Sequence, residues 1–249
     1  MKADVFAEQF IPDHVFFYVS AGTLNCYDGN KKYTFRTGEY CLARKNRLAR
    51  YSGEKGKEFE VVFICFEEAF IRKIGGKYKA KATGFAPSGT FIKIEPTELI
   101  PEFICSLKPY YRRGQMDEAF AGVKYEELLM ILLQNQPELG DLFFNYDPPD
   151  KINLEEFMNR NYQFNVSVPR FAYLTGRSLS AFKRDFKIIF HETPNRWLVQ
   201  KRLGEAYFLI SKKNKKPSDI YLDLGFEALS HFSYAFKKQF GLTPTELAK

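Results

Sequence analysis

The sequence contains few of the residues on which metal centres, disulfide frameworks and catalytic sites depend. Its 249 residues include four cysteines and three histidines, and no two cysteines form a C-x-x-C pair. Cysteines at that spacing mark zinc knuckles and redox motifs, and a dense cysteine pattern marks a disulfide framework. We therefore expect no metal site, no cofactor and no disulfide, and free, buried thiols at Cys26, Cys41, Cys65 and Cys105.

Long apolar segments are also missing. The longest purely apolar run, VVFICF at residues 61–66, is far shorter than the ~20 residues of a membrane-spanning helix. The first ten residues, MKADVFAEQF, show neither the basic leader nor the apolar core of a signal peptide. The sequence thus predicts a cytoplasmic protein that does not enter a membrane.

Charge is divided unevenly between the two halves of the chain. The net charge is +7, but residues 151–249 carry 17 Lys and Arg against 9 Asp and Glu, which gives +8. Residues 1–150 carry 20 against 21, which gives −1. Because the whole excess lies in the C-terminal half, that half is expected to bind a polyanion such as nucleic acid.

The most informative stretch covers residues 225–244, GFEALSHFSYAFKKQFGLTP. Apolar residues recur there every three or four positions, which predicts a helix of roughly three turns with one buried stripe. The opposite face is polar and basic, and it suits either solvent, as on any surface helix, or the major groove of DNA. The stripe comprises Leu229, Phe232, Ala235, Phe236 and Phe240, and the opposite face comprises Ser230, His231, Tyr234, Lys237 and Lys238.

An internal repeat favours the second interpretation. A shift of 50 residues places 174–194 on 224–244 with 9 identities among 21 positions, mostly in the apolar stripe and the closing Thr-Pro pair. Such a repeat indicates one supersecondary unit used twice. A short helix, a glycine-containing turn and a longer helix together describe a helix-turn-helix, which places its second helix in the major groove.

The two units are predicted as follows. The first begins at Ser167 as a helix cap, turns at Thr175 and Gly176, and resumes as a helix over residues 178–190. The second begins after a proline with Ser218 as its cap and turns at Gly225.

One long helix is predicted between the units. It starts at Pro194 with PNRWLVQKRLGEAYFLISKK and would fix the distance between them. Its expected inward side comprises Trp197, Leu198, Leu203, Ala206, Tyr207 and Ile210.

A set of residues in the second unit matches a known family pattern: Ile220, Gly225, Phe226, Ser230, Phe232, Phe236, Lys237, Lys238, Phe240, Gly241, Thr243 and Pro244. They resemble the AraC/XylS-type transcription regulators, whose DNA-binding domain is a pair of helix-turn-helix units joined by a long helix. The resemblance covers about residues 152–249 and implies binding to double-stranded DNA. It also implies activation through RNA polymerase, rather than repression, and a homodimer. His191 stands where the family usually has glycine.

The chemistry of the exposed side chains predicts which of them contact DNA bases and which contact phosphates. In the first unit the stripe Phe182, Phe186, Ile189 and Phe190 should face the core. Arginine pairs bidentately with guanine, and lysine does so more loosely, while cations near helix ends contact phosphates. We expect Ser180, Lys183, Arg184, Ser230, His231 and Tyr234 to read bases, and Lys187, Lys237 and Lys238 to contact phosphates.

The N-terminal half shows the pattern of short antiparallel strands. Strand-like segments lie between residues 14 and 66, with turn signals at Asp28-Gly29-Asn30 and at Gly38. This pattern predicts a small antiparallel β barrel or sandwich and resembles the cupin-like sensor domain of the same family. Metal-dependent cupins need several histidines, whereas this half contains only His14, so we expect a binding module without catalytic residues.

A helical pair and a linker complete the organisation. Apolar periodicity over residues 97–135 predicts two helices that either cover the open sheet or form a dimer interface. The segment NYDPPD at 145–150 predicts a linker, because two prolines cannot continue a helix. Asn153 and Glu156 then form a capping-box-like helix start.

The predicted fold is α+β. Residues 1–150 are expected to form an antiparallel, cupin-like β barrel with a helical pair that senses an effector and dimerises. Residues 151–249 are expected to form an all-α DNA-binding domain. The predicted function is a sequence-specific transcription regulator controlled by a small ligand. Two alternatives remain. One is a regulator controlled by a protein partner, and the other is a DNA-repair alkyl-transfer protein with the same DNA-binding domain.

Overall fold

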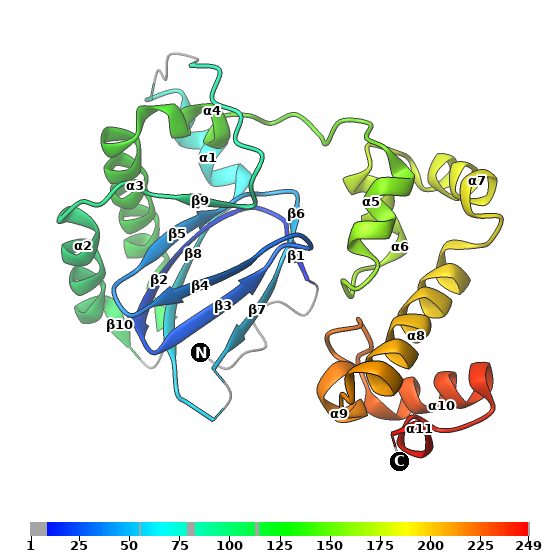
Figure 1. Ribbon diagram of the computed structural model, residues 1–249. Coiled ribbons are helices and arrows are strands. Elements are labelled where there is room, and N and C mark those ends of the chain that lie inside the picture. The colour runs from blue at the N-terminus through cyan, green and yellow to red at the C-terminus, as the bar shows by residue number, and fades with distance from the viewer. Residues whose placement is uncertain (1–8, 55, 79–82, 113–114, 249) are drawn as a thin grey trace.

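The computed structural model describes residues 9–54, 56–78, 83–112 and 115–248, and it divides into two parts (Figure 1). A β-rich lobe precedes residue 144, and a helical lobe begins at α5 (Leu154–Asn161). Residues 1–8, on which the expected absence of a signal peptide depends, lie outside the described ranges. Within those ranges, no helix is both long enough and apolar enough to cross a membrane. The domain boundary at residue 150 stays a prediction.

Antiparallel strands build the β-rich lobe, as predicted. The Asp-Gly turn joins β3 to β4, and hydrogen bonds group the longer strands into a four-stranded sheet (β8-β2-β5-β9) and a three-stranded sheet (β4-β3-β7). Short strands form two further pairs, β1 with β6 and β10 with β11. The strands are β1 (Phe10–Ile11), β2 (His14–Ala21), β3 (Thr23–Tyr27), β4 (Lys32–Arg36), β5 (Tyr40–Ala43), β6 (Arg47–Leu48), β7 (Arg50–Gly53), β8 (Glu60–Phe66), β9 (Phe91–Lys93), β10 (Tyr111–Arg112) and β11 (Gln115–Met116).

The four-stranded sheet is buried on both faces. Along β2, Val15 and Phe17 pack toward the three-stranded sheet, whereas Phe16 packs toward helices. This alternation follows from the two-residue period of a strand, and it makes the lobe three layers deep, with helices on one side (Figure 1). Those helices are α1 (Glu68–Gly75), α2 (Leu99–Leu107), η1 (Lys108–Tyr110), α3 (Glu118–Asn135), η2 (Pro137–Leu139) and α4 (Gly140–Phe143).

The helical lobe contains the two predicted units. The first comprises α6 (Val168–Leu174) and α7 (Leu179–Phe190), and the second comprises α9 (Pro217–Ile220) and α10 (Leu229–Phe240). The predicted long helix is α8 (Pro194–Lys213), and Thr243 caps α11 (Pro244–Leu247) in a capping box.

Helix α9 departs from the prediction at its start. Lys216 is at the N-cap and Pro217 is the first helical residue, so Ser218 is not the cap. Proline suits this position, because the missing N–H would have no helical partner and the fixed φ is already helical.

The two lobes share a hydrophobic core. Phe10 and Leu48 from the β-rich lobe are buried in one cluster with Phe171 and Leu154 of the helical lobe. Tyr27 stacks on Phe164 with ring centroids 5.8 Å apart. These contacts fix the first unit against the strands.

Candidate nucleic-acid interface

Helix α7 is held by the apolar stripe that the sequence predicted. Phe182 and Phe186 are fully buried, and the Oγ atom of Ser178 caps the helix by accepting from the N–H of Ala181 at 3.3 Å. At the other end His191 adopts φ +57°, the left-handed conformation that glycine most easily supplies. Ile189, predicted to face the core, is 38% exposed, because the core covers the stripe of Phe182, Phe186 and Phe190 and Ile189 lies at the edge of that stripe.

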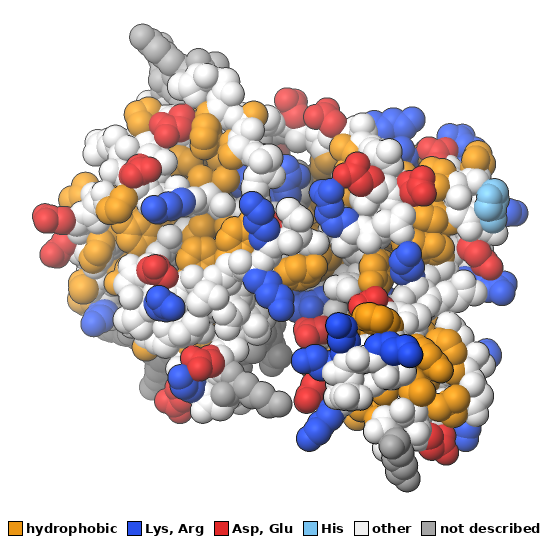
Figure 2. Space-filling model, in the orientation of Figure 1, with side chains coloured by type: hydrophobic (Ala, Val, Ile, Leu, Met, Phe, Trp, Pro, Cys, Tyr) orange, Lys and Arg blue, Asp and Glu red, His pale blue; other side chains and the backbone are white. Residues whose placement is uncertain are grey.

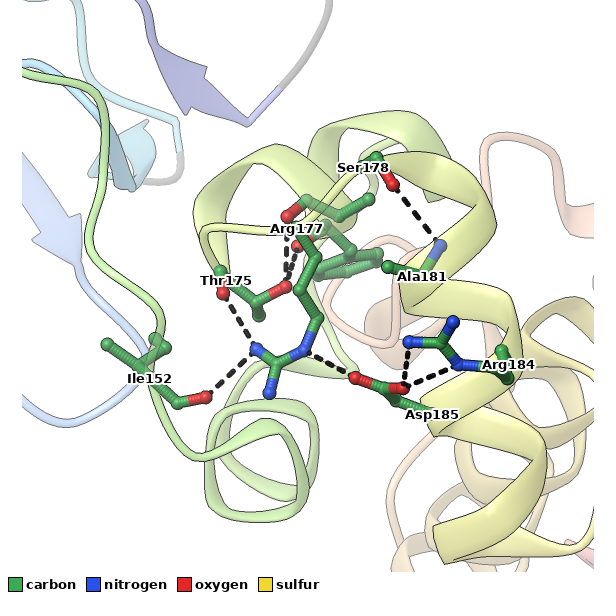
Figure 3. Close-up of polar contacts among 9 residues, drawn as sticks. Ile152, Thr175, Arg177, Ser178, Ala181, Arg184 and Asp185 are labelled. Carbon is green, nitrogen blue, oxygen red and sulfur yellow. Dashed lines mark hydrogen bonds and ion pairs between the residues drawn. The ribbon is translucent and has the colours of Figure 1, made fainter.

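The turn before α7 is locked onto the segment that leads into the helical lobe. Gly176 has φ +65°, and a Cβ atom there would lie 2.5 Å from the carbonyl carbon of Asp150. Nη1 of Arg177 donates to the carbonyls of Ile152 at 2.9 Å and Thr175 at 2.7 Å (Figure 3). The turn and the segment therefore cannot move independently.

Asp185 connects this turn to the predicted base reader Arg184. One carboxylate oxygen accepts from Nε of Arg177 at 3.2 Å, and the other accepts from Nε and Nη2 of Arg184 at 3.3 and 3.2 Å (Figure 3). The hydrogen bond from Arg177, followed by the one from Arg184, holds the pKa of Asp185 below its usual value. The side chain of Arg184 is 72% exposed, so Asp185 orients a guanidinium that remains open to solvent.

Helix α10 presents the equivalent face in the second unit. Phe232 and Phe236 are fully buried, whereas Tyr234 is 69% exposed. The ring of His231 contacts that of Phe226 edge-on at 5.9 Å, which restrains the histidine beside the helix start. Leu229, predicted to be buried, is 40% exposed, because it is the first residue of the helix and precedes the covered part of the stripe.

All nine predicted contact residues lie on the surface, in two separate groups. Ser180, Lys183, Arg184 and Lys187 form one stripe on α7, because their spacing of three or four residues is that of a helix face. The α10 group comprises Ser230, His231, Tyr234, Lys237 and Lys238. The structure thus places a polar and basic face on each of two helices, and the individual base and phosphate assignments stay predictions.

Helix α8 separates the two faces. Its 20 residues span about 30 Å at 1.5 Å per residue, and α7 and α10 lie at its opposite ends (Figure 1). This length is close to the ~34 Å between successive major grooves on one side of B-form DNA.

Two arginines that the sequence analysis missed join the turn of the second unit to the segment that follows α5. Arg202, on α8, donates to the carbonyls of Tyr162 at 2.7 Å, Phe164 at 2.8 Å and Gly225 at 3.0 Å. Arg50, on β7, donates from Nη2 to the carbonyls of Gln163 and Asp223 at 3.1 and 2.9 Å, and from Nη1 to the carboxylate of Asp223 at 2.9 Å. We call Arg50 and Arg202 the arginine clamp.

The turn of the second unit is shaped to fit this clamp. Gly225 has φ +80°, and a Cβ atom there would lie 2.8 Å from the Gln163 carbonyl oxygen and 2.9 Å from Cζ of Arg202. The glycine that the sequence identified as a turn signal is therefore also a packing requirement.

The cysteines and His14 do not form a reactive site. Cys26 and Cys41 are buried as predicted, but Cys65 and Cys105 are exposed, because they lie at outward-facing positions of β8 and α2. Burial raises the pKa of Cys26 and of Cys41, which suppresses formation of the thiolate. His14 is buried in the β-rich lobe. No group of three or more potential metal ligands occurs among the described residues.

The chain matches two family models, one for each lobe. Residues 14–142, more than half of the chain, match the ExsA N-terminal regulatory domain, and residues 171–249 match a helix-turn-helix domain. The virulence regulon transcriptional activator VirF of Yersinia enterocolitica is 22% identical over 234 residues, which cover 90% of this chain and 85% of that one. The regulator ExsA of Pseudomonas aeruginosa is 23% identical over 230 residues, which cover 90% of this chain and 82% of that one.

Among solved structures, the chain was superposed on ToxT of Vibrio cholerae. A single-residue variant of apo ToxT superposes with a TM-score of 0.45 and 14% identity over 97% of this chain and 90% of that one. ToxT bound to an unsaturated fatty acid superposes with a TM-score of 0.42 and 14% identity over 97% and 88% of the two chains. VirF and ExsA are named as regulators and not as enzymes, so the DNA-repair alternative receives no support.

Proposed function

Because the chain belongs to the AraC/XylS-type transcription regulators, through an ExsA-type N-terminal regulatory domain and a C-terminal helix-turn-helix domain, we propose that it is a sequence-specific activator. Helices α7 and α10 enter successive major grooves on one side of the duplex. The observation that carries this proposal is the pair of exposed, polar and basic helix faces at the two ends of α8.

Activation is supported by the relatives. VirF is named a transcriptional activator, and a further relative, RhaS of Yersinia pestis, is named an HTH-type transcriptional activator at 24% identity over 231 residues. RNA polymerase is then the protein partner on DNA. A cytoplasmic location belongs to the same proposal, because the DNA that the chain binds lies there.

The two faces are not equal in the proposal. On the exposed face of α7, Lys183 and Arg184 contact base edges. On that of α10, Ser230, His231 and Tyr234 do so, and this face carries fewer charges and discriminates less between bases. Asp185 orients the guanidinium of Arg184, which supports Arg184 as the main base-contacting residue. An oriented guanidinium loses less side-chain freedom when it pairs with guanine. Lys187, Lys237 and Lys238 are proposed to neutralise phosphates.

Replacing Arg184 with alanine tests the proposal. The variant should lose about 1 to 3 kcal/mol of binding free energy at the cognate site and should accept other bases at one position. Selection of bound sequences from a randomised DNA pool, followed by titration at several salt concentrations, measures both effects.

Lys237→Ala provides the matched contrast. It should weaken binding to all sequences alike and reduce the slope of log K against log salt by about one. If Arg184→Ala weakens binding to all sequences equally, Arg184 contacts a phosphate and not a base. If Lys237→Ala leaves the salt slope unchanged, Lys237 does not contact a phosphate. Absence of selective binding by the unmodified chain would overturn the proposed function itself.

We propose that the β-rich lobe controls DNA binding by taking up a small ligand. The match to a domain described as regulatory supports control from this lobe. The alternative is control by a protein partner without a ligand. A thermal-shift screen of small molecules distinguishes the two hypotheses. A ligand that binds only the folded chain raises the melting temperature.

A homodimer formed through α3 is the remaining part of the proposal. Phe120, Val123 and Met130 are 51%, 66% and 41% exposed, and their spacing of three and seven residues places them on one stripe of α3. Leu99 on α2 is 51% exposed as well. An apolar stripe at heptad-like spacing suits pairing with the same helix of a second copy.

Val123→Glu should convert the dimer into a monomer, because it places two like charges in the shared stripe. Sedimentation velocity at micromolar concentration measures the change. Lys93→Glu, a charge change at an exposed position of β9 outside the stripe, serves as the control and should stay dimeric. Equal sedimentation of Val123→Glu and the unmodified chain would place the dimer contact elsewhere.

A further inference from the structure

A cleft of about 1020 Å³ lies where the β-rich lobe meets the start of the helical lobe. Its volume is at the upper end of the range of about 300 to 1,000 Å³ for small-molecule sites. Lys31, Arg44 and Arg47 line it from the β-rich lobe, and Lys151 and Arg160 line it from the other side. Figure 2 shows basic side chains gathered at this junction of the two lobes.

Positive charge exceeds negative charge in the lining. Six lysines and arginines line the cleft against three aspartates, Asp28, Asp147 and Asp150. Asp28 is occupied by the turn that it supports, since its carboxylate accepts from the N–H groups of Asn30 and Lys31 and from the hydroxyl of Tyr33. With six cations against three aspartates, the lining carries a formal excess of three positive charges.

Arg44 and Arg47 are the least compensated of these cations. Nη1 of Arg44 donates to the neutral carbonyls of Pro87 and Gly89, and Nη1 of Arg47 donates to that of Asn46 at 3.2 Å. No carboxylate in the described ranges forms an ion pair with either arginine. Burial lowers the pKa of Arg44 to about 10, helped by the charge of Arg47, and burial also lowers the pKa of Arg47.

Two other lining cations are already paired outside the cleft. Lys45 reaches Glu68 at 3.5 Å, and Arg160 reaches Glu156 at 2.8 Å. Unlike Lys45 and Arg160, Arg44 and Arg47 have no carboxylate partner in the described ranges. Their partly buried guanidinium groups repel each other. Such an arrangement costs stability unless an anion compensates it.

We propose that this cleft binds a small molecule that carries two or more phosphate or carboxylate groups. The guanidinium fork matches the oxygens of either group, and several donors remain open on Arg44 and Arg47. Lys31 and Lys151 add charge from the rim. The proposed ligand class excludes neutral molecules such as sugars, because they would leave the charges of Arg44 and Arg47 uncompensated.

Occupancy couples the two lobes, because the walls of the cleft come from both. Lys151 adjoins Asp150 and Ile152, which contact Gly176 and Arg177 at the turn before α7. An anion bridging Arg47 and Lys151 would therefore favour one placement of α7. This step rests on the proposed function, whereas binding of the anion does not.

Binding is tested with the full chain and two probes, inorganic pyrophosphate and citrate, at matched ionic strength against sodium chloride. Thermal shift and calorimetry should show saturable, one-site binding, and the stronger probe distinguishes a phosphorylated ligand from a polycarboxylate. Arg47→Gln and, independently, Lys151→Gln should raise the dissociation constant about tenfold or more. Lys93→Gln, which removes an exposed cation of β9 outside the cleft, should change nothing.

The outcomes separate this inference from the proposed function. Absence of saturable binding by both probes, or equal binding by the cleft variants and Lys93→Gln, would overturn the anion site even if DNA binding is confirmed. Saturable binding that Arg47→Gln and Lys151→Gln both weaken supports the site even if DNA binding fails. Coupling is supported if pyrophosphate changes DNA affinity more in the unmodified chain than in Arg47→Gln, and it is refuted if the two changes are equal.

Discussion

Replacing Arg202 with methionine should lower the free energy of unfolding of the helical lobe by about 3 to 5 kcal/mol. Arg202 is 9% exposed and donates to three backbone carbonyls, two after α5 and one in the turn of the second helix-turn-helix unit. Methionine keeps most of the apolar stem but donates no hydrogen bond. The carbonyls of Tyr162 and Gly225 would then be left without the partner that the buried guanidinium supplies.

Lysine cannot substitute for this arginine. Its ammonium is a single donor centre, whereas the planar guanidinium reaches carbonyls on two separate segments at the same time. We therefore expect Arg202→Lys to recover less than half of the lost stability. Lys212→Met removes an exposed cation of the same helix and should cost less than about 1 kcal/mol, as surface substitutions usually do.

Urea unfolding followed by Trp197 fluorescence measures these differences. Trp197 is the single tryptophan and lies on α8, in contact with Phe186 and Phe190, so it reports the helical lobe. The expected loss corresponds to a fall of about 1 to 2.5 M in the midpoint, for a slope of about 2 to 3 kcal/mol/M. An Arg202→Met variant within about 1 kcal/mol of the unmodified chain would show that the carbonyls find other donors.

The repeat and its turns could be predicted because their signals are local. Phe182 and Phe186 lie at helical spacing, and so do Phe232 and Phe236 in the second unit. Gly176 and Gly225 mark turns whose positive φ other residues rarely adopt. The antiparallel N-terminal strands and the long helix α8 followed from the same short-range patterns. Errors occurred at element ends, as at Leu229 and Ser218, because periodicity does not show where the core stops covering a helix.

The arginine clamp could not be predicted, because it depends on chain segments that meet only in the folded protein. Arg50 and Asp223 are 173 positions apart, and nothing near Arg50 in the sequence distinguishes it from other strand cations. The partners of Arg202 are carbonyls, which every residue has, so no sequence pattern points to them. One available signal was the cationic Arg202 inside the otherwise apolar side of a predicted helix.

His14 should make the β-rich lobe sensitive to mild acid. Its Nε2 atom lies 3.0 Å from the carbonyl oxygen of Leu142 on α4, and its Nδ1 atom accepts from the N–H of Lys45 at 3.4 Å. Both contacts suit the neutral ring with the proton on Nε2. Burial, and then the charges of Lys45 and Arg44, lower the pKa of His14 from 6.5 to about 3.

The sign of the effect follows from proton uptake. Between about pH 6.5 and pH 3 the unfolded chain protonates this histidine and the folded chain does not, so acid favours unfolding. The expected loss is about 2 kcal/mol between pH 7 and pH 5 and reaches about 3 kcal/mol at pH 4. The value at pH 5 depends mainly on the unfolded pKa, because the folded chain remains unprotonated there.

His14→Gln isolates this contribution, because its amide can donate to the Leu142 carbonyl but does not titrate. Urea unfolding at pH 7 and pH 5, followed by circular dichroism of the β structure, should show about 2 kcal/mol less acid loss in the variant than in the unmodified chain. His231→Gln, at an exposed position of α10, should keep the pH profile of the unmodified chain. Parallel profiles for His14→Gln and the unmodified chain would mean that His14 protonates in the folded protein, with α4 displaced from the sheet to hydrate it.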